Sequence, residues 1–215
     1  MAFDLLTLDE AEASSKADDS LGKLRGWVEG YLMQTHPELG RSGIVCPFTR
    51  LAQKHDTLRL AICEATPGNP DDIFAAIRHG YETLDRIPAT RETAVLRAVV
   101  IGFPNCDSEA GLSMVHQGQK RHKLHAAMCF RMLGLMHPTS EARGVWNPDF
   151  RPLRAPMPVL AMRHMVEQDA ALIADHRLQW PPYFLKFGVP GVRRILKLRK
   201  ARSGSPRPTA AHLAN

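Results

Sequence analysis

Short runs of aliphatic and β-branched residues alternate along this chain with longer segments that have helical periodicity. Two runs have the alternation or the β-branched density of strands, TLRLAICEA at 57–65 and TAVLRAVVIGFP at 93–104. A third strand is predicted in PVLAMRHMV at 158–166, and a shorter apolar piece, RMLGLM, precedes it. Segments with helical periodicity lie between and before these runs, at 21–34, 49–55, 73–86 and 108–130.

This order of elements predicts an α+β fold, in which an antiparallel or mixed sheet packs against helices. No glycine-rich phosphate loop follows any of the predicted strands. At 215 residues, the chain has the length of a single domain with a core and a small pocket. We expect this domain at 21–185, after a flexible acidic segment at 1–20 and before a basic amphipathic helix and disordered tail at 186–215.

The sequence predicts a cytoplasmic protein with reduced cysteines. No apolar run approaches the roughly 18–20 residues needed to cross a bilayer, and the first residues are too acidic for a targeting signal. The four cysteines form no C-x-x-C pair, so we expect free thiols and no zinc site among them.

The positive charge of the chain is concentrated at its C-terminal end. All nine Lys and Arg residues after Asp175 lie in a stretch without Asp or Glu, whereas the part before it has an acidic excess. This distribution argues against a basic nucleic-acid-binding domain. The tail is predicted to contact an acidic protein or a membrane surface, or to be a solvated basic face without a partner.

The segment RGVWNPDFRPLRAPMPVL joins a high density of proline to three arginines, Arg143, Arg151 and Arg154. Proline restricts the backbone, which lowers the entropy cost of holding guanidinium groups in place. Arginine offers a planar fork of donors, which suits the capture of a carboxylate or a phosphate. A purely structural loop is the alternative, in which Asp149 pairs with Arg151 or Arg154.

Two histidines and one cysteine are further candidates. His137 precedes Pro138 after an apolar piece, so its imidazole is expected at a junction between strand and loop. His164 is expected on the same strand face as Met162, with Arg163 on the opposite face. Cys46 is either an apolar filler or a thiolate before a helix. Each histidine could instead be structural, bonded to a loop carbonyl.

These motifs together resemble an uncharacterised bacterial family. The resemblance rests on CPF at 46–48, MHP at 136–138, NPDFRPLRAPMP at 147–158 and LAMRHMV at 160–166, where the family has CPF, FHP, N-P-x-x-x-P-L-R-S-P-x-P and A-I-R-H-M-V. It spans roughly residues 24–173. More distantly, the pattern is similar to the YqcI/YcgG family, of which some members are haem-dependent enzymes that hydroxylate nitrogen on guanidino amino acids.

The resemblance implies a role for several of these residues. His137 would be the first candidate for the ligand of a haem iron or for a distal acid, and His164 the second. Arg154 and Arg163 would bind haem propionates or a substrate carboxylate, with Arg143 and Trp146 as further binding residues and Cys46 in the pocket. Met136, Ala155 and Met157 depart from the family's pattern, and these departures bear on the substrate more than on the fold.

Two functions from different classes follow. The first is a haem-dependent oxygenase-like tailoring enzyme, a monooxygenase resembling an N-hydroxylase, that acts on a small nitrogen-containing metabolite. The second is a non-catalytic ligand-binding or accessory protein of a biosynthetic pathway. In both, the expected ligand is a small molecule with anionic or zwitterionic character, and no specific binding of nucleic acid is expected.

Overall fold

The computed structural model describes residues 3–15, 19–174 and 176–203. Contacts within the chain divide it into two compact units, Met1–Met165 and Val166–Asn215. The second unit therefore begins before the boundary that the sequence predicts near residue 185, because the segment after Met165 already packs with the C-terminal helix.

A four-stranded sheet forms the centre of the first unit. Its strands are β1 (Leu58–Ile62), β2 (Ala98–Gly102), β3 (Arg131–Met136) and β4 (Val159–His164), in the spatial order β1-β2-β4-β3. β1 pairs with β2 in parallel, whereas β4 is antiparallel to both of its neighbours, β2 and β3. The first three strands thus run in one direction, and β4 is inserted between two of them. This mixed sheet confirms the predicted α+β fold.

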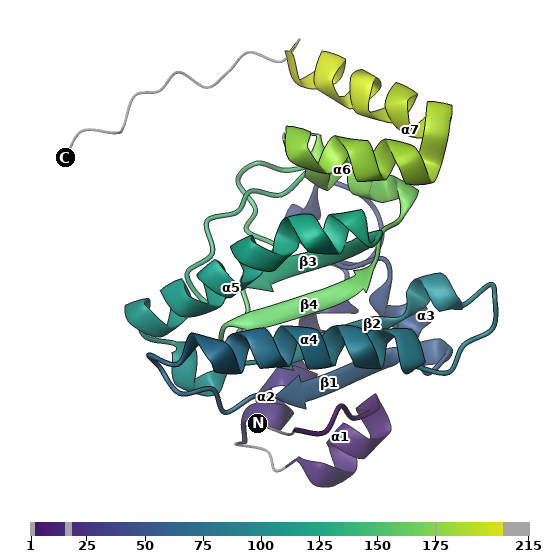
Figure 1. Cartoon of the computed structure of the whole chain (residues 1–215). Helices are drawn as coiled ribbons and strands as arrows, with labels where there is room; N and C mark the ends of the chain where they lie inside the picture. The colour runs from purple at the N-terminus through teal and green to yellow at the C-terminus, as the bar shows by residue number, and fades with distance from the viewer. Residues whose placement is uncertain (1–2, 16–18, 175, 204–215) are drawn as a thin grey trace. The chain divides into compact units, whose positions relative to one another are not determined.

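Two long helices, α4 (Pro70–Arg86) and α5 (Glu109–Met128), cover one face of the sheet (Figure 1). Ile73 and Val115 of these helices are fully buried in one core with Ile101 and Leu160 of the strands. Ser108 caps α5, since its side chain accepts a hydrogen bond from the Gly111 amide. In α4, Asn69 is at the N-cap position, and Asp71 and Asp72 lie in the first turn.

The opposite face is covered by α1 (Leu8–Ser14), α2 (Ser20–Trp27), the π-helical turn η1 (Val28–Leu32) and α3 (Thr49–Lys54). The described part of the acidic segment at 1–20 packs on the sheet. Leu6 exchanges two backbone hydrogen bonds with Leu60 of β1, and Leu8 and Ala11 are buried on the sheet. Apolar residues at helical spacing hold this acidic segment to the core.

Short 3-10 turns connect the elements of the first unit. They are η2 (Pro37–Leu39), η3 (Ala94–Leu96) and η4 (Pro104–Cys106). The predicted strand at 93–104 is therefore shorter in the structure, because residues 94–96 form η3 and Pro104 begins η4.

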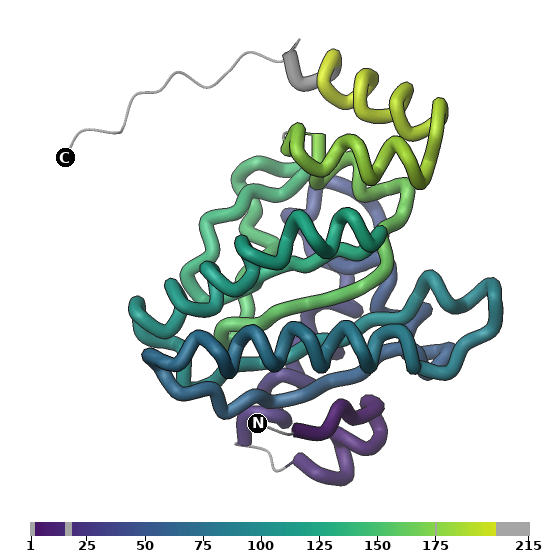
Figure 2. Tube along the Cα trace, in the orientation of Figure 1, coloured from purple at the N-terminus to yellow at the C-terminus, as the bar shows by residue number. Residues whose placement is uncertain are grey.

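The second unit consists of η5 (Glu167–Asp169), α6 (Ala170–Ile173), η6 (Arg177–Gln179) and α7 (Trp180–Ser203). Helix α7 is interrupted at Gly188, whose φ of 57° and ψ of −146° lie outside the helical region and favour glycine. Figure 2 shows the trace reversing between the two halves of α7. Tyr183 is fully buried and donates a hydrogen bond to the Glu167 carbonyl at 2.7 Å. No helix in the described part of the chain is long and apolar enough to cross a membrane.

Candidate anion site at the carboxyl edge of the sheet

β1, β2 and β3 end at the same edge of the sheet, and each is followed by polar residues. Glu64 follows β1 and Asn105 follows β2, and the Asn105 amide donates a hydrogen bond to the Glu64 carboxylate at 2.8 Å. His137 directly follows β3. The carboxyl edge of parallel strands is the usual place for a ligand in open α/β sheets. The loop that returns to β4, residues 137–158, begins at this edge.

His137 ties the two ends of this loop together through its backbone. Its amide donates to the Leu153 carbonyl at 3.2 Å, and its carbonyl accepts from the amides of Ser140 at 3.1 Å and Ala155 at 3.4 Å. Its imidazole Nδ1 lies 3.2 Å from the Thr139 hydroxyl. Burial, with a smaller contribution from His116, lowers the pKa of the His137 imidazole. His137 is therefore a neutral side chain at neutral pH.

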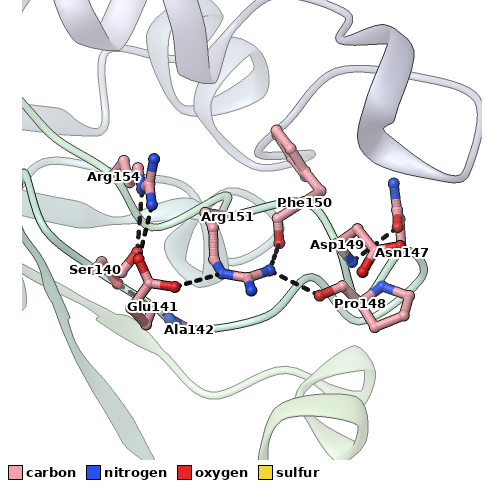
Figure 3. Close-up of polar contacts among 9 residues, drawn as sticks. All are labelled: Ser140, Glu141, Ala142, Asn147, Pro148, Asp149, Phe150, Arg151 and Arg154. Carbon is pink, nitrogen blue, oxygen red and sulfur yellow. Dashed lines mark hydrogen bonds and ion pairs between the residues drawn. The ribbon is translucent and has the colours of Figure 1, made fainter. Parts of the chain in front are cut away.

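Two of the three arginines of the loop, Arg151 and Arg154, converge on one carboxylate, that of Glu141 (Figure 3). Glu141 accepts from Arg151 Nε at 3.1 Å and from Arg154 Nη2 at 2.8 Å. The Arg154 Nε donates to the Ser140 carbonyl at 3.2 Å, and the Arg151 Nη1 donates to the Pro148 carbonyl at 2.7 Å. These hydrogen bonds from Arg151 and Arg154 hold the pKa of Glu141 below its ordinary value. The two guanidinium groups thus form one carboxylate-binding site, which we call the arginine pair.

Glu141 replaces the partner that the sequence predicts. Asp149 is closer to both arginines in the sequence, but the structure pairs them with Glu141 instead. The backbone amide of Asp149 is bound by the side chain of Asn147 in a tight turn. In the structural alternative Asp149 pairs with Arg151 or Arg154, but Glu141 takes that place, because this turn and the fold of the loop bring residue 141 beside them.

An aromatic cluster holds the loop in place. Trp27 Nε1 donates to the Arg154 carbonyl at 3.0 Å, and the Tyr31 hydroxyl donates to the Pro152 carbonyl at 3.2 Å. The two rings stack on each other, and His36 stacks on Phe150 with ring centroids 4.5 Å apart. Trp27 is the last residue of α2 and Tyr31 lies in the π-helical turn η1, four residues further on, so both donors reach the same stretch of backbone. The arginine pair is thereby held on a fixed backbone.

Arg143 and Trp146 belong to the same loop, and both side chains are exposed. The backbone around them is ordered by a hydrogen bond from the Gly144 amide to the Phe150 carbonyl and by one from the Asn147 side chain to the Glu38 carbonyl. The Trp146 side chain is 61% exposed. Both residues could contact a ligand at the arginine pair only from the solvent side.

His164, Arg163 and Cys46 lie elsewhere. In the pairing of β3 with β4, Met136 is opposite Val159 and Arg131 is opposite His164. These two residue pairs are five positions apart along the strands, which is about 17 Å at the rise per residue of a strand. His137 and His164 are thus at opposite edges of the sheet. The structure therefore does not bring the two candidate histidines together.

Arg163 lies beside the CPF motif, residues 46–48. Its guanidinium carbon lies 4.7 Å from the centre of the Phe48 ring, and its Nη1 donates to the His164 carbonyl at 3.0 Å. Arg163 is on the same face of the sheet as Ala161, the face that α2 covers. His164 is on the same face as Met162, the face that α4 covers, as the alternation of side chains along a strand predicts. Cys46 donates its amide to the Leu32 carbonyl and is half-buried beside the core. This arrangement favours the filler interpretation of Cys46.

The described residues do not fit a haem group. His137 and Arg154 are at one edge of the sheet, and His164 and Arg163 are at the other. A hollow of about 350 Å³ is lined by Glu29, Met33, Gln34, Arg50, Gln53 and Lys54, none of them a predicted ligand. A haem site needs an axial ligand, an anchor for the propionates and an apolar cavity in one place. Within the described ranges, no group of three or more His, Cys, Asp or Glu side chains is arranged to hold a metal ion.

One family model matches this chain, and it covers residues 21–197. Its description is "Domain of unknown function (DUF6875)". The chain belongs to this family. The matched residues include the sheet, the arginine pair and most of α7, so the candidate site is part of the family's domain. No curated protein and no solved structure matches the chain.

The pH dependence of stability tests the environment of His137. Because folding lowers the pKa of its imidazole from 6.5, the unfolded chain binds the proton more readily as the pH falls through that value. The free energy of unfolding should therefore decrease from about pH 7.5 to about pH 5.5, and His137→Asn should reduce this decrease. Urea unfolding of both proteins at the two pH values measures it.

In the His137→Asn variant, part of the decrease in the free energy of unfolding should remain, because burial also lowers the pKa of the His116 imidazole. His55→Asn, the same change at an exposed histidine, is the control for the substitution itself. The same decrease in His137→Asn as in the unchanged protein would contradict the assignment.

Proposed function

We propose that this protein is a non-catalytic binding or accessory protein of a biosynthetic pathway and that it binds a small carboxylate-bearing metabolite at the arginine pair. The observation that supports this proposal is the carboxylate of Glu141, which both guanidinium groups hold at 2.8 and 3.1 Å. Its side chain is 71% exposed, so a ligand can exchange with it from solvent without any opening of the core. Glu141 then acts as an internal substitute for the ligand.

The surroundings of the arginine pair favour a ligand that is zwitterionic or carries one anionic end. Arginine forks bind carboxylates in fixed geometry, and the fixed backbone beneath them lowers the entropy cost of binding. His137 is neutral, so it adds a donor or an acceptor for an uncharged part of the ligand and no further positive charge. Trp146 and Leu153 provide exposed apolar surface in the same loop.

Removal of the competing carboxylate tests the proposal. Glu141→Gln should raise the affinity for small carboxylates by up to about tenfold, because the ligand no longer has to break two exposed ion pairs. Isothermal titration calorimetry with free amino acids, short dicarboxylates and inorganic phosphate measures the affinity.

The matched control is Asp149→Asn. It removes one negative charge from the same exposed loop, but the structure pairs neither arginine with Asp149. We expect its affinities to equal those of the unchanged protein. If Glu141→Gln binds none of the probes more tightly than Asp149→Asn does, the arginine pair is a structural element of the loop and the proposal is wrong.

The haem-dependent oxygenase implied by the distant resemblance to the YqcI/YcgG family stays a separate prediction, as does the cytoplasmic location. A neutral His137 has the protonation state that a haem ligand requires. The separation of the other candidates across the sheet is the reason that we prefer the binding protein. A Soret band in the protein mixed with haemin, lost in His137→Ala, would reverse this preference.

A further inference from the structure

The second half of α7 has two contrasting faces. Ile195 is fully buried, and Gly191 lies so close to Tyr183 and Phe187 that a Cβ atom would be 2.9 Å from either side chain. These residues form the inner face, which packs within the second unit. The other face carries Val189, Arg193, Leu196 and Lys197, and we call these four residues the outer face of α7.

The outer face places apolar and cationic side chains side by side in water. Val189, Arg193 and Leu196 are spaced by four and three residues, so they form one stripe along the helix, and Lys197 flanks it. The side chains of Val189 and Leu196 are 62% and 57% exposed. Single exposed apolar residues are common on soluble proteins, but here two share one stripe with cations.

The charge of this segment has one sign. From residue 176 to the C-terminus the sequence contains no Asp or Glu. Two cations are engaged within the unit, since Arg194 pairs with Glu167 at 3.3 Å and Arg199 lies 5.1 Å from the centre of the Trp180 ring. Arg193 and Lys197 are exposed on the outer face instead. The outer face is thus complementary to a negatively charged surface.

We propose that the outer face of α7 docks on the surface of an anionic phospholipid bilayer. A bilayer surface offers lipid phosphates to Arg193 and Lys197 and, at the same depth, acyl chains to Val189 and Leu196. A nucleic-acid backbone would neutralise the cations and leave the two apolar side chains in water. The helix lies in the plane of the interface and does not enter the hydrocarbon core. This contact does not depend on the arginine pair of the first unit.

Vesicle sedimentation of the full chain tests the proposal. We expect the protein to sediment with vesicles of phosphatidylcholine mixed with phosphatidylglycerol, and much less with phosphatidylcholine alone. Arg193→Gln combined with Lys197→Gln should lower the partition coefficient about thirtyfold, because each basic residue near an anionic surface contributes roughly a factor of five. Val189→Ser combined with Leu196→Ser should lower it by a similar factor, because their burial in the interface is lost.

Matched controls change the same residue types elsewhere. Lys23→Gln with Lys120→Gln removes two exposed charges from α2 and α5, and Val95→Ser with Leu124→Ser removes two exposed apolar side chains. Both controls should sediment as the unchanged protein does. All four variants change exposed positions, and circular dichroism verifies that each is folded.

Three results would overturn the proposal. The first is equal sedimentation of the α7 variants and their controls, which would assign any binding to net charge alone. The second is binding to polyglutamate without binding to either kind of vesicle, which would indicate an acidic protein as the partner. The third is sedimentation that does not depend on phosphatidylglycerol.

Discussion

Replacing Gly111 by alanine is expected to lower the free energy of unfolding by about 2–3 kcal/mol. Gly111 is the third residue of α5, and its amide is bound by the capping side chain of Ser108. An added Cβ atom would lie 2.6 Å from Cys106 Cα and 2.9 Å from the carbonyl carbon and oxygen of the same residue. Backbone atoms cannot rotate away as a flexible side chain does, so either the cap or the turn η4 has to shift.

Urea denaturation measures this effect, with Gly26→Ala as the control. Gly26 lies inside α2, and no atom would approach within 4 Å of a Cβ atom there. The control should be neutral or stabilising by up to about 1 kcal/mol, since alanine is the better helix former. Equal stability of the two variants would contradict the close approach of Gly111 in α5 to Cys106 in η4.

Arg151→Gln combined with Arg154→Gln should abolish the proposed carboxylate binding, with a loss of affinity of at least about tenfold. Both substitutions keep hydrogen-bond donors but remove the charge and the fork. Glu141 loses its partners in this variant, but it is largely exposed, so water can solvate its carboxylate and the fold should remain intact. The unfolding transition and the calorimetric titration are measured on the same protein.

The matched control is Arg86→Gln combined with Arg91→Gln. It removes two exposed arginines that lie outside the loop, and it should leave the affinity unchanged. Adding Glu141→Gln to the double variant of the arginine pair should not restore binding, because no cation remains to bind the ligand. Restored binding, or an unchanged affinity in the double variant, would place the ligand elsewhere.

The sequence predicts the elements of the first unit better than their arrangement. The apolar runs at β1, β2 and β4 and the helical patterns of α4 and α5 are confirmed, since local periodicity determines them. Local periodicity does not determine that β4 separates β2 from β3. The tertiary contact that holds the acidic N-terminal segment also escapes prediction, because it depends on Leu6 meeting β1 far along the chain.

The candidate site was predictable only where its residues are close together in the sequence. The HP junction and the arginines share one loop, so the sequence places His137 near Arg154. Grouping His164 with them fails because the direction of β4 decides which edge of the sheet its last residue occupies. Glu141 was missed, although it lies in the same loop, since sequence distance favoured Asp149. Trp27 and Tyr31 lie in the segment 21–34, for which the sequence predicts only a helix, and their role as donors to the loop appears only in the fold.

The insertion of β4 between β2 and β3 has a consequence for folding of the chain during its synthesis on the ribosome. β3 has no hydrogen-bonded neighbour in the sheet until β4 has been synthesised, because its pairing within the sheet is with that strand. A nascent chain that ends before residue 159 therefore exposes β2 and β3 as open edges, which are templates for aggregation. Pairing of β4 with both of its neighbours completes the sheet and anchors the C-terminal end of the loop that carries the arginine pair.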